Sequence, residues 1–139
     1  QYVADPDFVP VDAAALTSPA YLAQRASLIG ARSMGRATAG QPAGIALSFA
    51  PDESAPRMAT SHVSAVDDRG HAVSMTTSIE DAFGSRQMVR GFLLNNQLTD
   101  FSFLPRESDG TGAARPDGAV VANRVQPGKR PRSSMSPTI

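Results

Sequence analysis

Residues 60–79 read TSHVSAVDDRGHAVSMTTSI and carry the strongest secondary-structure pattern in the chain. Two runs of mixed apolar and polar side chains flank Asp68-Arg69-Gly70, in which the glycine suits the left-handed position of a tight turn. The pattern predicts an antiparallel hairpin with strands over residues 61–67 and 71–79.

Upstream of this hairpin, Ser18-Pro19 is typical of a helix start, because a hydroxyl N-cap precedes a proline at the first helical position. Apolar residues then recur at helical spacing and predict a helix from about Pro19 to about Ser33. Residues 11–16 are a candidate for a second, short helix. Residues 35–59 contain several prolines and glycines and indicate a loop or linker that leads into the hairpin.

Downstream, residues 91–94 form a third apolar run. Residues 106–117 are rich in Gly, Ser and Asp and indicate a surface loop. Residues 119–125 suit either a short strand or an extended arm. The elements together predict an α+β chain with an N-terminal helix and an antiparallel sheet.

Composition excludes several classes of function. The chain has 139 residues with 13 basic and 13 acidic side chains, so its zero net charge argues against nucleic-acid binding, and the basic cluster at residues 129–132 is too short to change this. It has no cysteine, which leaves no thiolate chemistry, and only two histidines, which are too few for most protein-only zinc sites without help from carboxylates. No apolar run approaches the roughly 18 residues of a membrane span.

Thr60 lies where the linker meets the first strand, and it supports two interpretations. If the bond between Ala59 and Thr60 were cut, Thr60 would hold a free α-amine beside its own hydroxyl. That amine titrates near pKa ~8 in a free peptide, so nucleophile and base would share one residue. The other interpretation is that a β-branched residue simply begins a strand, and spacing alone favours it.

Two polar segments could bind a ligand. Residues 133–136 follow two prolines and a glycine, and their hydroxyls suit a carboxylate; residues 95–100 carry amides and an acid that suit a zwitterion. Taken alone, residues 133–136 are better explained as an ordinary polar loop with a basic patch, and residues 95–100 could simply cap a strand end and a helix. We expect a structural role for His62 and a solvent-facing position for His71.

Five motifs follow one another in a characteristic order. Together they closely resemble the γ-glutamyltransferase family, strongly over residues 60–101 and 127–139 and more weakly over residues 1–59. The motifs are Thr60-Ser61-His62-Val63-Ser64, Asp67-Asp68-Arg69-Gly70, Phe83-Gly84-Ser85, Leu93-Leu94-Asn95-Asn96-Gln97-Leu98-Thr99-Asp100-Phe101, and the run from Pro127 to Thr138.

This resemblance implies a fold and a reaction. The fold would be part of an N-terminal-nucleophile hydrolase, a four-layer αββα sandwich, with residues 1–59 ending a large subunit and residues 60–139 beginning a small one. Self-cleavage between Ala59 and Thr60 would create the nucleophile. The mature enzyme would transfer the γ-glutamyl group of substrates such as glutathione to water or an amino acid, without a cofactor.

The resemblance also implies roles for individual residues. Ser78 matches a hydroxyl residue that supports the nucleophile. Gln97 and Asp100 match positions that hold the α-amino group of the substrate, for which a carboxylate is a natural partner. Ser133 and Ser134 match the two hydroxyls that bind the α-carboxylate.

Glu80 stands where the family commonly has asparagine. A carboxylate there accepts from an ammonium but repels a carboxylate, so a cephalosporin-acylase-like amidase is an alternative function. A second alternative is a non-catalytic, uncleaved module.

The resemblance places further parts of the enzyme outside these residues. The family's oxyanion hole lies downstream and its substrate-binding arginine upstream. Since losing one oxyanion donor costs about 10²–10³ in rate, we expect the 139-residue chain alone to be inactive and to require the remainder of both subunits. Uncovered sheet faces would favour oligomerisation, and the family suggests a periplasmic or extracellular location.

Overall fold

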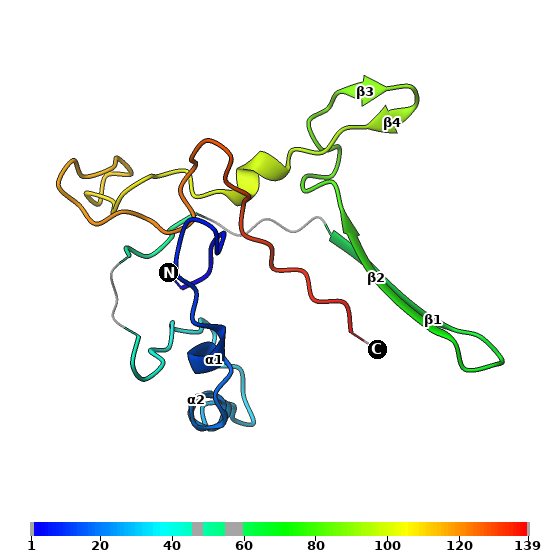
Figure 1. Cartoon of the computed structure of the whole chain (residues 1–139), viewed down its shortest axis with the longest axis horizontal. Coiled ribbons are helices and arrows are strands. Elements are labelled where there is room, and N and C mark those ends of the chain that lie inside the picture. The colour runs from blue at the N-terminus through cyan, green and yellow to red at the C-terminus, as the bar shows by residue number, and fades with distance from the viewer. Residues whose placement is uncertain (1, 46–48, 55–59, 139) are drawn as a thin grey trace.

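The computed structural model describes residues 2–45, 49–54 and 60–138, which form short elements joined by long extended segments (Figure 1). In chain order the elements are α1 (Ala13–Leu16), α2 (Pro19–Ala26), β1 (Thr60–Val66), β2 (Ala72–Ser78), β3 (Met88–Val89), β4 (Phe92–Leu93) and a 3-10 helix, η1 (Gln97–Asp100).

The predicted hairpin is confirmed. Strands β1 and β2 pair antiparallel in a register that sets Thr60 opposite Ser78. The turn depends on Gly70, whose φ of 85° is the left-handed value that glycine adopts without strain, and on the Asp67 carboxylate, which accepts from the backbone N–H of Arg69 and His71. The His71 ring bonds the same carboxylate at this exposed end of the hairpin.

Helix α2 begins where the sequence predicts and ends earlier. The Ser18 hydroxyl accepts from the backbone N–H of Tyr21 and caps the first turn. The predicted end at Ser33 is wrong, because the helix stops at Ala26. The next apolar side chains, Leu28 and Ile29, are 49% and 80% exposed, so no packing favours further helical turns. The short helix predicted within residues 11–16 is α1.

The remaining segments are mostly irregular. The apolar run at residues 91–94 contains β4, which pairs with β3. Residues 106–117 contain no named helix or strand, as a surface loop should. For residues 119–125 the sequence predicted either a short strand or an extended arm, and the structure has the extended arm. Only isolated bridges occur there, and two of them join Val121 to Ala50 and Arg124 to Ser102.

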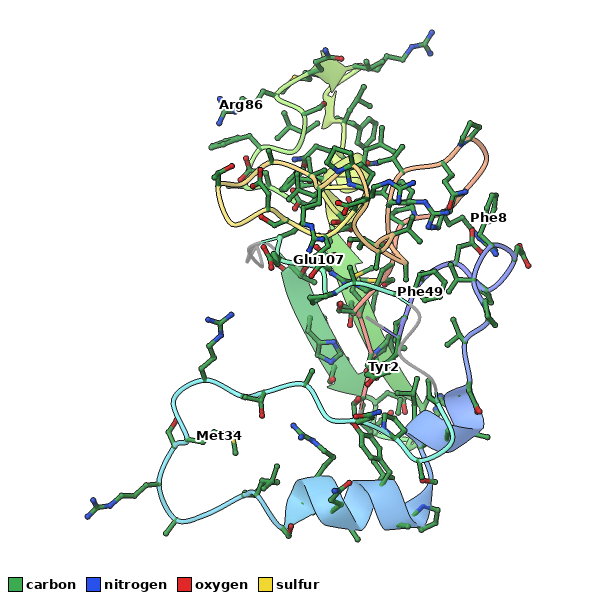
Figure 2. All side chains as sticks on the ribbon, turned by 90° about the vertical axis from the view of Figure 1, so that its left-hand side faces the viewer. Tyr2, Phe8, Met34, Phe49, Arg86 and Glu107 are labelled. Carbon is green, nitrogen blue, oxygen red and sulfur yellow. The ribbon has the colours of Figure 1, made fainter. Side chains whose placement is uncertain are left out.

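The small core lies in what we call the body, residues 2–9, 49–54 and 97–132. Phe49, which is labelled in Figure 2, packs against a cluster of Ala4, Val9 and Ala122. Polar side chains are buried nearly as often as apolar ones, so hydrogen bonds organise this core. The buried polar or charged residues among those described are Asp5, Glu80, Ser102, Asn123 and Lys129.

The chain exposes far more surface than a compact protein of its mass. Its accessible area is 10324 Å², whereas a folded 14.5 kDa monomer exposes roughly 6,900 Å². The β1–β2 hairpin projects from the body (Figure 1), and its Val63 and Met75 are 50% and 51% exposed. The α+β class with antiparallel strands is confirmed, and the αββα sandwich remains a prediction. Within the described ranges, no helix is long and apolar enough to cross a membrane.

Candidate functional site

A cleft of about 510 Å³ lies between the β1–β2 hairpin, η1 and residues 132–136. Every predicted site residue that the structure describes lines it; Ala59 lies outside the described residues. These parts are separated by up to 76 positions in the chain, so only the fold brings them together. The predicted residues in the lining are Thr60, Ser78, Glu80, Gln97, Asp100, Ser133 and Ser134.

Thr60 is held by its partner on the neighbouring strand. Opposed residues of an antiparallel pair project to the same face, and the Thr60 hydroxyl donates to Ser78 Oγ at 3.2 Å. The backbone N–H of Glu80 also donates to Ser78 Oγ, at 2.9 Å. Since the Ser78 oxygen already accepts these two hydrogen bonds, Ser78 orients the Thr60 hydroxyl and is a poor base for it.

Polar side chains continue along the same face of the hairpin. His62 bonds Thr76 Oγ1 through Nδ1 at 2.8 Å and Ser64 Oγ through Nε2 at 3.0 Å. The hydroxyls of Ser64 and Ser74 both donate to the carbonyl oxygen of Thr138. This ladder ties the segment after Ser134 to the hairpin, and His62, which takes part in it, also lines the cleft.

Gln97 and Asp100 lie together on η1. Gln97 Nε2 donates to Asp100 Oδ2 at 3.4 Å, and the buried Gln97 Oε1 has no hydrogen-bond partner among the described residues. The backbone N–H of Asn96 donates to the carbonyl of Ile79, which joins η1 to the end of β2. A carboxylate beside an unpaired amide oxygen is an acceptor-rich surface that suits an ammonium group.

Glu80 is buried and strained. Its exposed fraction is 7%, its φ is 73°, and its Oε2 has no hydrogen-bond partner within the part of the chain described. A left-handed backbone is uncommon for residues other than glycine and asparagine, and such strain concentrates at functional sites. The unpaired carboxylate oxygen gives this part of the cleft an acceptor for a cationic group.

The opposite wall carries hydroxyls and a positive charge. Ser133 and Ser134 follow Arg132, whose guanidinium lies 3.3 Å from the Asp52 carboxylate. Burial acts to raise the pKa of Asp52, but hydrogen bonds from Ser54 and Ser102 and the charge of Arg132 outweigh it and hold that pKa below its usual range. Adjacent hydroxyls beside a guanidinium suit an anionic group.

The other cations of the basic cluster have partners within the chain. Arg130 binds Asp5 through its guanidinium and its backbone N–H, and these hydrogen bonds hold the pKa of Asp5 well below its usual range. Arg130 also pairs with Asp7 at 2.6 Å. The Lys129 ammonium donates to backbone carbonyls, including that of Ala122. The cluster therefore fastens the loop that leads to the two serines.

Sequence reasoning missed Asn123, which contacts both walls of the cleft from within the body. Its backbone and side-chain groups bond Ser102, Asp100 and Arg132. A lone amide inside the apolar run at residues 119–125 was the available signal, since buried polar groups require partners. No group of three His, Asp or Glu side chains in the described ranges is placed to hold a metal ion.

Comparisons with known proteins identify the family of the chain. The profile of the family described as Gamma-glutamyltranspeptidase matches residues 1–139. A glutathione hydrolase proenzyme of Pseudomonas aeruginosa is 39% identical over 140 residues, covering 99% of this chain and 22% of the relative. The protein of the same name in Escherichia coli is 40% identical and is matched over 100% of this chain and 22% of the relative. The one in Bacillus subtilis is 37% identical and is matched over 99% of this chain and 23% of the relative. The chain thus spans about a fifth of the length of these relatives.

Proposed function

Because the chain belongs to the γ-glutamyltranspeptidase family, we propose that it carries the self-cleavage junction and the acyl-binding cleft of a γ-glutamyl-transferring enzyme. The observation that carries this proposal is the convergence of Thr60, the Gln97–Asp100 pair and the Ser133–Ser134 pair on one cleft. Cleft volumes of roughly 300–1,000 Å³ are usual for small-molecule ligands.

The first reaction is cleavage of the chain before Thr60. The Thr60 hydroxyl attacks the carbonyl carbon of Ala59; its oxygen forms a bond to that carbon as the C–N bond breaks, and the nitrogen takes up a proton. The resulting ester is hydrolysed by water, which leaves a carboxylate on Ala59 and a free amine on Thr60. The hydrogen bond from Thr60 to Ser78 presets the hydroxyl for this attack.

In the second reaction the free amine acts as the base. It accepts the hydroxyl proton of Thr60 as the oxygen attacks the γ-carbonyl of the substrate, and it returns the proton to the leaving amine. A γ-glutamyl ester on Thr60 remains. Water or the amine of an amino acid then attacks this ester, releasing glutamate or a new γ-glutamyl compound and restoring the Thr60 hydroxyl.

Charge in the cleft sets the orientation of the acyl group. Asp100 and the amide oxygen of Gln97 receive the α-ammonium, and the hydroxyls of Ser133 and Ser134 donate to the α-carboxylate near Arg132. Glu80 adds a second acceptor for the ammonium. This balance favours γ-glutamyl over glutaryl substrates, since a glutaryl group brings no cation to the buried carboxylate of Glu80.

Substitution of Thr60 by alanine in the complete gene product tests the proposal. Intact-mass measurement should show an uncleaved chain, and hydrolysis of a γ-glutamyl anilide should fall by on the order of 10⁴-fold or more. Thr60→Ser, which keeps a hydroxyl and an α-amine, should retain both reactions. Cleavage and turnover that persist in the alanine variant would falsify the assignment of Thr60.

A further inference from the structure

Two loops of the cleft must be held at a fixed separation if one substrate is to contact both. One loop ends at Asp100 and the other begins at Arg132, so no local structure links them. A binding site needs its groups placed within roughly 0.5 Å, which requires support from rigid neighbours. A buried side chain among the described residues hydrogen-bonds to both loops.

That side chain is Asn123. Its Nδ2 donates to the backbone carbonyl of Asp100 at 2.7 Å, and its Oδ1 accepts from the backbone N–H of Arg132 at 3.0 Å. Asn123 is 2% exposed, so water does not compete for these bonds. The two ends of one amide thus span the gap between the loop of Asp100 and the loop of Ser133 and Ser134.

The bridge itself is fixed in place by the body. The carbonyl of Asn123 accepts from the backbone N–H of Ser102 at 2.9 Å. The buried Lys129 ammonium donates to the carbonyls of the residues on either side, Ala122 and Arg124. Because both the main chain and the side chain of Asn123 are bonded, its amide has little freedom to move.

The chemistry of the bridge specifies an amide. A carbonyl faces one end of the side chain and an N–H faces the other, so the residue must donate and accept at once. Aspartate has nearly the same shape but presents an oxygen to the Asp100 carbonyl, which repels it. An apolar residue would leave both backbone groups unpaired.

We propose that Asn123 is a positioning residue that sets the separation between the α-amino and α-carboxylate subsites. The proposal rests on the proposed function, since it assigns the two loops to the two ends of one γ-glutamyl group. Asn123 makes no contact with the substrate in this scheme. Its loss should therefore weaken ligands that engage both loops and spare ligands that engage only one.

The test is Asn123→Asp in the complete gene product, with competitive inhibition constants measured against a γ-glutamyl anilide. L-Glutamate has both the ammonium and the carboxylate, and glutarate lacks the ammonium. The constant for L-glutamate should rise on the order of tenfold, the size expected for one lost buried hydrogen bond, and that for glutarate less than about twofold. The value of kcat should change less than about threefold, and two subunits should still form.

Val121→Ala is the matched control, because Val121 is equally buried in the same arm and does not line the cleft. It should lower the melting temperature and leave both inhibition constants unchanged. If Asn123→Asp does not yield two subunits, Asn123→Ser takes its place with the same expected ratio.

Each further outcome has one meaning. Equal weakening of both inhibitors, no weakening, or the same pattern in Val121→Ala overturns the positioning role. If the wild-type protein does not turn over the γ-glutamyl anilide, whether or not it is cleaved, the proposed function is wrong. The inference about Asn123 is then wrong as well.

Discussion

The β1–β2 hairpin and the body carry the two halves of the cleft and are stabilised in different ways. Every residue of β1, including Thr60, is exposed, and the hairpin is held mainly by its own ladder. The body buries Asn123, Lys129 and Asp5 in hydrogen bonds that join segments far apart in the chain. The proposed nucleophile thus stands on a locally determined element, and the proposed substrate-binding segments depend on a non-local polar network.

This difference predicts that substitutions in the two regions have separable effects. Changes in the hairpin should alter the rate of chemistry, because they move the Thr60 hydroxyl. Changes in the body should alter binding or stability, because they move the loops around Asp100 and Ser133. The hairpin also leaves several apolar side chains exposed, among them Val63, Val66 and Met75.

Apart from substitution of Thr60 itself, the largest effect is expected for Ser78→Ala in the hairpin. The Thr60 hydroxyl loses its acceptor and the N–H of Glu80 loses a partner, so kcat should fall roughly tenfold or more and self-cleavage should slow. The KM for a γ-glutamyl anilide should stay within about threefold, and Ser78→Thr should retain near-native rates. If Ser78→Ala had a native kcat and a raised KM, the hairpin would affect binding as the body does, and the predicted difference between the two regions would be wrong.

An intermediate effect is expected for Glu80→Asn, at the junction of the regions. Asparagine tolerates the φ of 73° and removes a buried, unpaired carboxylate oxygen, so the free energy of unfolding should rise by about 1 kcal/mol. The preference for L-glutamate over glutarate should fall. Glu80→Gln removes the charge but keeps the backbone strain. Comparing the thermal unfolding of the two variants therefore separates the effect of the buried charge from the effect of the positive φ. Loss of stability in Glu80→Asn would contradict this interpretation.

The smallest effect is expected for Asp5→Asn in the body, and it should depend on pH. Arg130 holds the pKa of Asp5 below its unfolded value, so the pair stabilises the fold fully above about pH 4, the usual pKa, and less as the pH falls through the lowered value. Acid unfolding followed from pH 7 to pH 2 should therefore be less steep in the variant. Asp68→Asn is the control, since Asp68 is exposed in the hairpin turn and its side chain has no hydrogen-bond partner among the described residues. Identical acid profiles of Asp5→Asn and the native protein would contradict the role of this pair.

The local parts of the fold were predictable. Alternating side chains and Gly70 predicted the hairpin, and Ser18-Pro19 predicted the start of α2, because these signals act over a few residues. The end of α2 was not predictable from periodicity, since Leu28 and Ile29 fit the helical pattern but meet no partner. Strand β3 and the helix η1 are too short to have a pattern of their own.

The family resemblance was enough to predict which residues belong to the candidate site. It did not show that these residues lie together around one cleft. Thr60, Ser78, Gln97, Asp100, Ser133 and Ser134 were all identified by matching positions of the chain to those of the family. Asn123 was not, because its role depends on two backbone groups that sequence patterns do not bring together. The burial and positive φ of Glu80 were equally hidden, although its departure from asparagine was visible.

The amino-acid sequence by itself determined the β1–β2 hairpin, the place of Thr60 at its first residue and the order of the family motifs, because each depends on neighbours within a few positions. Only the tertiary structure decided that Asp5 meets Arg130 across 125 positions and that Asn123 bridges Asp100 and Arg132. Such contacts arise when buried polar groups must find partners, and the partner is whichever complementary group the folded chain brings within hydrogen-bonding distance.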